Sequence, residues 1–290
     1  MIGKAMSVVY LNGQFMPAED AKISPMDRGF LFGDGIYEVI PSYGGRCVGF
    51  AAHIQRLQQG LAALEIHCAL TEQDWYELVQ QLIRQNGAGN LGIYLHLSRG
   101  TDTKRAHAYP KNVPATVFAY CFEIAAEPKA DVNKAPRYKV ITSTDLRWQR
   151  CHIKSTALLG NVMHHQQAAA LGLNECILFD EQGFLTEGSS TNVFIVKDAV
   201  VITPPLSHKI LPGITRQLLL SILRQHSPLK VEERPVSKYE VLRADEVWLT
   251  SSSKEIAAVI EVDGQAIGNS EPGPLWLQAQ QLFSEHKYSY

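Results

Sequence analysis

The segment LTEGSSTNVFIV, residues 185–196, combines a glutamate, a turn of small polar residues and an apolar strand. Glu187 precedes Gly188, Ser189 and Ser190, and the apolar run begins after Asn192. Hydroxyl and amide groups crowded ahead of a buried strand can hold a carboxylate rigidly beside a polar ligand. A turn carboxylate that faces water is the ordinary alternative, so the interpretation depends on other segments of the chain.

About thirty residues upstream, the stretch HIKSTALLGN places Lys154 in a hydroxyl-rich setting ahead of a predicted helix. A free lysine has a pKa near 10.4 and is a poor nucleophile at neutral pH. Desolvation or a nearby helix N-terminus can activate it, although a solvated lysine near a helix start is the ordinary alternative. Pyridoxal phosphate needs a lysine for an imine, an acid for its ring nitrogen and donors for its phosphate.

Three segments provide candidate phosphate donors. The stretch ILPGITR places Pro212-Gly213 ahead of a predicted helix, so the backbone amides of Ile214 and Thr215 are free N-terminal donors. LTSSSKEI gathers hydroxyl groups at a strand end, and Arg56 in HIQRL offers a guanidinium fork. Each could be an ordinary cap, turn or solvated helix face. Their joint occurrence with the lysine and the glutamate favours a cofactor site.

Composition and charge limit the class of protein. The chain has 290 residues, of which 46% are apolar and 19% charged, and its net charge is −2. Neither sign runs in blocks, which argues against a nucleic-acid surface or a polybasic membrane anchor. No apolar run reaches the ~18 residues of a membrane span, and the first residues do not resemble a signal peptide. The 5 separated cysteines, without a CxxC pair, indicate reduced thiols in a cytoplasmic protein.

The hydrophobic pattern predicts an α+β protein, because strands arrive in groups separated by single helices. Asn12-Gly13 predicts a first hairpin and Gly44-Gly45 a second turn. Helices are expected at 52–64, 72–85, 158–171, 214–223 and 274–286. Strands are expected at 91–99, 115–124, 138–142, 175–180, 192–196, 199–203, 229–234, 245–250 and 256–262. The stretch EPKADVNKAP, residues 127–136, is the predicted linker between a small domain (1–126) and a large, cofactor-binding domain (137–290).

Other kinds of site find little support. The chain has no GxGxxG or Walker A motif, which lowers the prior of nucleotide-binding folds. His164 and His165 are adjacent on a predicted helix and therefore point in different directions, so no metal pair is expected. No HExxH motif or Ser-His-Asp arrangement is recognisable.

The motifs resemble, in order and spacing, those of the fold-type IV pyridoxal-phosphate enzymes. That group holds branched-chain aminotransferases, D-amino-acid aminotransferases and aminodeoxychorismate lyase. The resemblance runs from about Val9 to Asp263. It rests on DRGFLFGDGIYEV (27–39), HIQRL (53–57), SRGTDTKRAH (98–107), IKSTALLGN (153–161), TEGSSTNVFIV (186–196), LPGITR (211–216) and LTSSS (249–253). It implies a small N-terminal α/β domain, a larger C-terminal α/β barrel-like domain, and a cofactor between them. It also implies a homodimer whose active sites borrow a loop from the neighbour.

The resemblance also implies roles for individual residues. Lys154 would be the imine-forming lysine and Glu187 the partner of the ring nitrogen. Leu211 would pack against the ring face. The phosphate would be held by Arg56, the backbone of Ile214 and Thr215, and Ser251 with Ser252.

Substrate choice depends on a second set of side chains. Tyr37 and Val39 alternate to the same side of a predicted strand, and Arg105 and His107 do likewise if KRAH is extended. An arginine and a histidine two residues apart, near a tyrosine, make a suitable trap for a substrate carboxylate. This RxH pair is similar to the D-amino-acid aminotransferase pattern, whereas branched-chain enzymes usually lack it. A solvated basic turn is the ordinary alternative for Arg105.

The predicted function is therefore a ping-pong transamination. It would move the amino group of a D-amino acid, such as D-alanine, to a 2-oxo acid such as 2-oxoglutarate or pyruvate. The alternatives on the same fold are an L-branched-chain aminotransferase, an aminodeoxychorismate lyase and an (R)-amine transaminase. A cofactor-binding protein without turnover is the non-enzymatic alternative.

Overall fold

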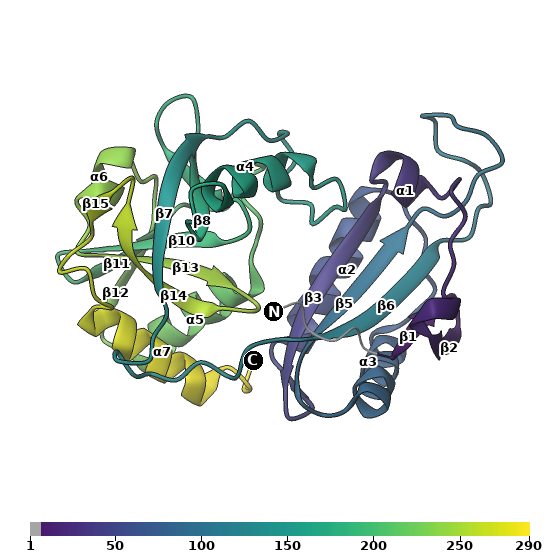
Figure 1. Cartoon of the computed structure of the whole chain (residues 1–290), viewed down its shortest axis with the longest axis horizontal. Helices are drawn as coiled ribbons and strands as arrows, with labels where there is room; N and C mark the ends of the chain where they lie inside the picture. The colour runs from purple at the N-terminus through teal and green to yellow at the C-terminus, as the bar shows by residue number, and fades with distance from the viewer. Residues whose placement is uncertain (1–6) are drawn as a thin grey trace. The chain divides into compact units, whose positions relative to one another are not determined.

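The computed structural model of the chain describes residues 7–290, so residues 1–6 of the predicted first domain lie outside the described residues. Contacts divide the chain into two compact units (Figure 1). One unit consists of the residues up to Glu127 together with Ile153–Leu158, and the other of Pro128–His152 together with Leu159–Tyr290. The predicted domain limits stay a prediction. The segment 153–158, expected in the second domain, groups with the first unit instead.

The first unit is built on a six-stranded antiparallel sheet with the strand order β2-β1-β6-β5-β3-β4. The predicted hairpin at Asn12-Gly13 is confirmed, and both residues have positive φ (47° and 95°), as a tight turn between twisted strands requires. The strands are β1 (Val8–Leu11), β2 (Gln14–Pro17), β3 (Gly35–Tyr43), β4 (Arg46–Cys47), β5 (Asn90–Ser98) and β6 (Thr116–Glu123).

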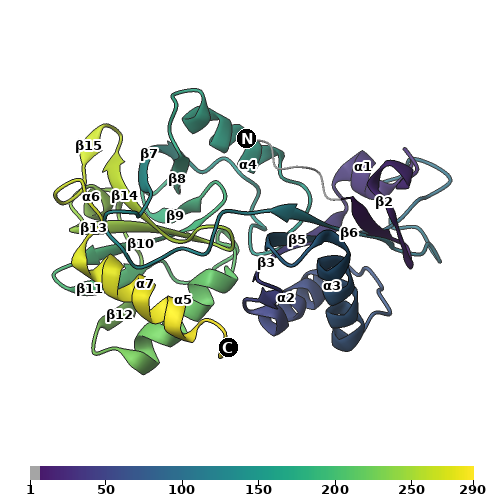
Figure 2. The same ribbon diagram turned by 60° about the horizontal axis from the view of Figure 1, so that its bottom comes forward.

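Two helices, α2 (Phe50–Ala63) and α3 (Glu72–Asn86), cover one face of this sheet (Figures 1 and 2). Ile54, Leu57 and Leu61 repeat at helical spacing on α2, and all are buried in the core of the unit. The helices expected at 52–64 and 72–85 are thus confirmed. The apolar residues of the two helices pack against the sheet and bury that face of it.

Two further helices of this unit, η1 (Ala18–Asp20) and α1 (Arg28–Phe32), were not predicted. Segments of 3 and 5 residues are too short to carry a hydrophobic period. Asp27 begins α1 by accepting the backbone N–H of Gly29 at 2.8 Å. Gly33 ends it in the left-handed region, with φ 63°, where glycine is favoured.

The second unit is built on a nine-stranded mixed sheet with the order β12-β11-β10-β13-β14-β7-β8-β9, and β15 pairs with β14 outside this path. The parallel pairs are β11 with β12, β14 with β7 and β7 with β8. The strands are β7 (Arg137–Thr144), β8 (Glu175–Phe179), β9 (Leu185–Gly188), β10 (Asn192–Lys197), β11 (Val200–Thr203), β12 (Lys230–Glu233), β13 (Glu246–Ser251), β14 (Glu255–Val262) and β15 (Gln265–Ala266).

The helices of this unit pack at different places on the sheet. The helices α5 (Ile214–His226) and α7 (Pro274–His286) lie side by side and contact β13 (Figure 2). The helix α4 (Leu159–Ala169) packs on β7 and β8, and the short α6 (Lys238–Leu242) was not predicted. The α+β class and the three long helices are confirmed. Among the residues described, no helix is both long and apolar enough to cross a membrane.

Candidate active site

Lys154 lies in an extended segment that runs along β3 of the first unit. The backbone N–H of Tyr37 donates to the carbonyl of Lys154 at 3.1 Å, and the N–H of Thr156 donates to that of Gly35 at 2.9 Å. The lysine is half-buried, and its Nζ lies 4.1 Å from the centre of the Tyr37 ring. The helix expected near residue 158 begins at Leu159. Strand pairing, rather than a helix end, therefore fixes the position of Lys154.

Arg56 lies on α2, where it takes part in a fully buried network with Glu38 of β3 and His53. Its Nε and Nη2 donate to the two carboxylate oxygens of Glu38 at 2.7 and 2.8 Å, and His53 Nδ1 contacts the same carboxylate at 2.7 Å. Burial by itself would raise the pKa of Glu38, but Arg56 and His53 outweigh it and hold this pKa well below its usual range. Burial lowers the pKa of His53, and its Nδ1 is the donor to Glu38 because an ionised carboxylate can only accept. The guanidinium of Arg56 is thus held in one orientation, and its phosphate role stays a prediction.

Glu38 was not anticipated as part of the site. Tyr37 and Val39 share one face of β3 and are half-buried, whereas Glu38 points to the opposite face with the fully buried Ile36 and Ile40. A carboxylate on an apolar strand face must find a cation. That pattern is the signal from which a buried ion pair could have been predicted.

The loop between β5 and β6 carries Arg105 and His107, and both side chains are exposed. Lys104 and His107 lie at bends, and Arg105 and Ala106 belong to no helix or strand, so the alternation expected for an extended KRAH stays a prediction. The two side chains nevertheless meet at one ring. The guanidinium carbon of Arg105 lies 5.0 Å from the centre of Phe32, and the ring of His107 lies 5.6 Å from it.

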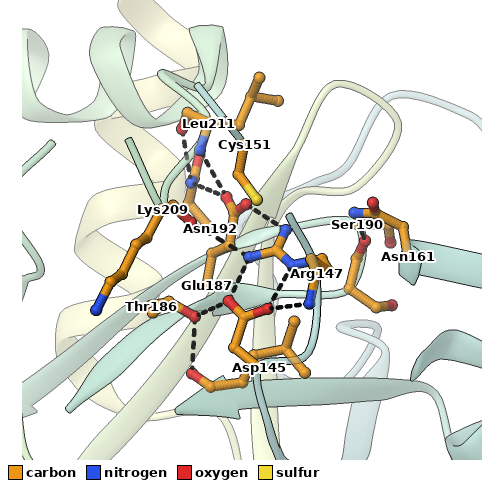
Figure 3. A network of polar contacts seen from close by, with 12 residues as sticks. Asp145, Arg147, Cys151, Asn161, Thr186, Glu187, Ser190, Asn192, Lys209 and Leu211 are labelled. Atoms are coloured by element: carbon orange, nitrogen blue, oxygen red, sulfur yellow. Dashed lines mark hydrogen bonds and ion pairs between the residues drawn. The ribbon is translucent and has the colours of Figure 1, made fainter. Parts of the chain in front are cut away.

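Glu187, on β9 of the second unit, is buried and accepts hydrogen bonds at both oxygens (Figure 3). Arg147 Nη1 donates to Oε1 at 2.6 Å. Asn192 Nδ2 and the backbone N–H of Leu211 donate to Oε2 at 3.1 and 3.0 Å. The amide of Asn192 also donates to the Leu211 carbonyl at 3.0 Å. Donors from three parts of the chain, at Arg147, Asn192 and Leu211, therefore converge on one carboxylate.

Arg147 is shared between Glu187 and a second carboxylate. Its Nε and Nη2 donate to the two oxygens of Asp145 at 2.9 and 2.7 Å, and Thr186 Oγ1 also donates to Asp145, at 2.8 Å. Burial raises the pKa of Glu187 to about 7, because the shared charge of Arg147 offsets burial only in part and Asp145 adds repulsion. A carboxylate in this state gains from a further cationic N–H donor. A protonated pyridine nitrogen is such a donor, so this carboxylate fits the expected cofactor.

Two of the predicted phosphate donors of the second unit, Ile214 and Thr215, are the first residues of α5. Gly213 precedes this helix, and no side chain among the described residues caps it, which leaves the first amides for a ligand. A Cβ at Gly213 would lie 2.0 Å from Asn192 Oδ1, so the close approach requires glycine. Asn192 stands opposite Thr250 in the pairing of β10 with β13. The same side chain thus touches the helix start and faces the end of β13.

Two hydroxyl groups at the end of β13 lack partners in the described part of the chain. Thr250 Oγ1 and Ser251 Oγ are buried and have no hydrogen-bond partner among residues 7–290. Buried hydroxyls without a partner are rare and call for an explanation. Thr250 stands opposite Asn192, which touches Gly213, so a phosphate bound at the first amides of α5 would explain the Thr250 hydroxyl, whereas a phosphate role for Ser251 stays a prediction. The donor set therefore fits the phosphate of the cofactor.

The structure brings the predicted residues together in two groups. Glu187, Leu211 and the start of α5 are joined through Asn192 in the second unit, and Lys154 and Tyr37 are in contact in the first. Sequence reasoning did not assign roles to Asn192, Thr250, Arg147 or Glu38. Asn192 and Thr250 lie inside the motifs TEGSSTNVFIV and LTSSS, and their polar side chains are a signal from which a role could be predicted. The contact of Arg147 with Glu187 leaves no local signal, because the two residues are 40 positions apart in the sequence.

Comparison with known proteins places these observations in a family. The model of the family described as amino-transferase class IV matches residues 35–262. A D-alanine aminotransferase of Bacillus licheniformis is 38% identical over 272 residues, which cover 94% of each chain. A D-alanine aminotransferase of Staphylococcus haemolyticus is 34% identical over 97% of this chain and 98% of its own.

Solved structures of similar fold include branched-chain amino acid aminotransferases. That of Escherichia coli superposes with a TM-score of 0.85 at 26% identity, covering 97% of this chain and 94% of its own. Another, from T.th. and solved with pyridoxamine 5′-phosphate, has a TM-score of 0.89 at 25% identity and covers 98% and 95% of the two chains.

Proposed function

The chain belongs to the class IV aminotransferases, and from this premise we propose that it is a pyridoxal-phosphate-dependent D-amino-acid transaminase. It would move the amino group of a D-amino acid such as D-alanine to a 2-oxo acid, 2-oxoglutarate or pyruvate, by a ping-pong mechanism. The observation that carries the proposal is the 38% identity with a D-alanine aminotransferase over 94% of both chains. The RxH pair of Arg105 and His107, noted in the sequence, supports the same choice of substrate.

The residues of the second unit would hold the cofactor. Glu187 would accept the N–H of the pyridine ring. The positive ring would compensate the part of the Glu187 charge that Arg147 does not. Leu211 would pack against the ring face, while its backbone N–H keeps Glu187 in place. The amides of Ile214 and Thr215 and the hydroxyls of Ser251 and Ser252 would bind the phosphate, with Arg56 of the first unit as a further donor.

Lys154 would carry the proton transfer. When bound, the cofactor supplies an electron sink for the bond broken at the substrate Cα. The amine of Lys154 would remove the Cα proton as a general base. As a general acid it would then deliver a proton to the cofactor carbon that carries the substrate nitrogen. The Tyr37 ring beneath its Nζ limits the directions that the amine can take.

Recognition of the substrate would rest on its carboxylate. Arg105 and His107 would bind this group with Tyr37 nearby, and Val39 would line the pocket beside Tyr37. A carboxylate held at one place determines which hydrogen of Cα faces the lysine. The chirality of the accepted amino acid follows from that choice.

We further propose a homodimer in which the loop that carries Arg105 and His107 contributes to the active site of the partner subunit. Apolar side chains on α4 and the loop before it support an interface, because Leu146, Leu159 and Met163 are 78%, 72% and 61% exposed. Coexpression of Lys154→Ala with Arg105→Ala tests the shared loop, since mixed dimers would contain one complete site. Activity of the mixture above that of either variant is expected. A mixture as inactive as its parts would contradict the shared loop.

The cytoplasm is the proposed location. All 5 cysteines are free thiols and three of them, Cys121, Cys151 and Cys176, are buried. Thiols without disulfides suit a reducing compartment.

The first test is the absorbance spectrum of the purified protein with pyridoxal phosphate. We expect a visible band that D-alanine converts to the pyridoxamine form, and that 2-oxoglutarate restores. Lys154→Ala should lower turnover about 10³- to 10⁴-fold, because the proton transfer loses its base. Repeated turnover by Lys154→Ala at nearly the wild-type rate would refute the assignment.

A second candidate, an L-branched-chain aminotransferase, is favoured by the structural similarity to the Escherichia coli enzyme at a TM-score of 0.85. The same titration distinguishes the two. Conversion of the band by L-leucine in preference to D-alanine would select the branched-chain activity.

A further inference from the structure

Arg28, the first residue of α1, binds the backbone of the loop that carries Arg105 and His107. The guanidinium of Arg28 donates through Nη1 to the Ala106 carbonyl at 2.5 Å and through Nη2 to that of His107 at 3.3 Å, with Ala108 at 3.5 Å. Arg28 is only 3% exposed. A buried arginine directed at consecutive carbonyls fixes the backbone of a loop whose own side chains are exposed.

A second arginine and an aspartate orient Arg28. Its Nε donates to Asp34 Oδ2 at 2.8 Å. Asp34 in turn accepts two hydrogen bonds from Arg99, at 2.8 and 3.0 Å. Arg99 is tied to the end of α2 through the carbonyls of Leu64 and Glu65, and its guanidinium lies 3.5 Å from the ring centre of Tyr109. The loop is thus anchored to the core of the unit through charged groups.

The same helix contacts both side chains of the RxH pair. Phe32, at the end of α1, lies 4.8 Å from the guanidinium carbon of Arg28 and also meets Arg105 and His107. The residue after it, Gly33, accepts a hydrogen bond from Thr156 Oγ1 at 3.0 Å. One turn of helix therefore joins the loop to the segment that contains Lys154.

We propose that Arg28 is a positioning residue for substrate carboxylate recognition, holding the backbone of 106–108 so that Arg105 and His107 present a preformed trap. The inference rests on the proposed function, because it assumes that these two side chains bind a carboxylate. Lysine cannot replace Arg28, since a single ammonium group does not reproduce a planar fork that reaches an aspartate and neighbouring carbonyls together. Phe32 assists by limiting the side-chain conformations of the pair.

The experiment titrates the cofactor-loaded protein with D-alanine, without a 2-oxo acid, and follows the visible absorption. Arg28→Lys and Arg28→Gln are compared with wild type and with Arg84→Lys, a control on the exposed side of α3. We expect the apparent Kd for D-alanine to rise about 10-fold in Arg28→Lys and further in Arg28→Gln. The limiting rate at saturation should change less than the Kd, and the Arg84→Lys control should match wild type.

Methoxyamine separates positioning from a general loss of structure, because it attacks the bound cofactor but has no carboxylate. The rate at which methoxyamine reacts with the bound cofactor should be the same in the Arg28 variants as in wild type. An unchanged Kd for D-alanine, or a parallel loss of methoxyamine reactivity, would overturn the inference. Phe32→Leu, which leaves the charged network intact, should raise the Kd by a smaller factor, with Phe32→Tyr restoring it. The two Phe32 variants keep the test decisive should the Arg28 variants not fold.

The two proposals can fail separately. A wild-type protein whose spectrum D-alanine does not change would refute the proposed function and the inference with it. A wild-type protein that responds, alongside Arg28 and Phe32 variants that bind D-alanine equally well, would remove the inference alone.

Discussion

Glu38 and Glu187 are both buried and both face an arginine, yet their pKa values move in opposite directions. Glu38, in the first unit, receives two hydrogen bonds from Arg56 and one from His53, and its pKa lies well below the usual range. Glu187, in the second unit, receives one hydrogen bond from Arg147, and burial raises its pKa to about 7. Burial is common to both, so the sharing of the arginine makes the difference.

Arg56 and His53 compensate the buried charge of Glu38, whereas Arg147 compensates that of Glu187 only in part. Arg56 gives two donors to Glu38, whereas Arg147 gives two to Asp145 and one to Glu187. A buried charge without full compensation is costly, and a bound cation can supply the missing part. We therefore expect substitutions at Glu38 to act mainly on stability and substitutions at Glu187 mainly on activity.

The largest expected effect is on catalysis, in Glu187→Gln. Glutamine keeps the side-chain shape and can still accept from Asn192 and Leu211, but it carries no charge to hold a ring proton. We expect the loaded enzyme to lose about 10³- to 10⁴-fold in kcat/KM, or roughly 4 to 5 kcal/mol of transition-state stabilisation. Steady-state kinetics with D-alanine measures this. Near wild-type turnover would show that the under-compensated carboxylate has no catalytic task.

The next effect is on folding, in Glu38→Gln. This change leaves the buried Arg56 without its carboxylate, at a cost of about 3 to 4 kcal/mol. Urea unfolding of the first unit measures the loss. Glu77→Gln, on an exposed turn of α3, is the matched control and should stay within about 0.5 kcal/mol of wild type. A stable Glu38→Gln protein would mean that the two networks do not differ as described.

The third effect is a pH dependence of opposite sign at the two sites. Glu187 has its pKa raised from 4.5 to about 7, so its contribution to stability is present below pH 4.5 and is lost as pH rises through 7. The shift corresponds to roughly 3 kcal/mol. For Glu38, whose pKa is lowered, the contribution is present above pH 4.5 and is lost as pH falls below it.

Thermal unfolding of the cofactor-free protein between about pH 5 and pH 8 measures this dependence for Glu187. The wild type should lose stability relative to Glu187→Gln as the pH rises. Adding pyridoxal phosphate should reduce the difference, because a bound cation favours the ionised carboxylate. Parallel curves for wild type and variant would exclude a raised pKa at Glu187.

The smallest expected effect comes from Asp145→Asn, which would make the second network resemble the first. Without the Asp145 charge, Glu187 would be the one carboxylate that Arg147 contacts among the described residues, so the pKa of Glu187 should fall. The pH dependence of the cofactor-free protein should then shift to lower pH, and kcat should change by about 10-fold or less. An unaltered pH profile would show that sharing of Arg147 does not set this pKa.

Sequence patterns predicted the local structure well for physical reasons. The hairpin at Asn12-Gly13 follows from residues that tolerate positive φ, and α2 follows from apolar side chains at helical spacing. The helix α1 was missed because a single turn has no period, although Asp27 and Gly33 mark its two ends. Glu187 and Lys154 could be proposed as site residues because the polar groups beside each of them are neighbours in the sequence.

The contacts that set the pKa of Glu187 and the position of the loop with Arg105 could not be predicted from the sequence. Arg147 and Glu187 are 40 positions apart, and Arg28 and Ala106 are 78 apart. An arginine has the same local appearance whether it is solvated, binds loop carbonyls or compensates a buried acid.

By itself, the sequence determined the α+β class and the main helices and strands, and it singled out Lys154 and Glu187 as the residues proposed to carry the chemistry. Only the tertiary structure decided that Lys154 pairs with β3, that Glu187 shares its arginine, and that Arg28 holds the loop. Propensity and periodicity act between neighbours in the chain. Burial and charge compensation depend on which distant residues the fold brings together.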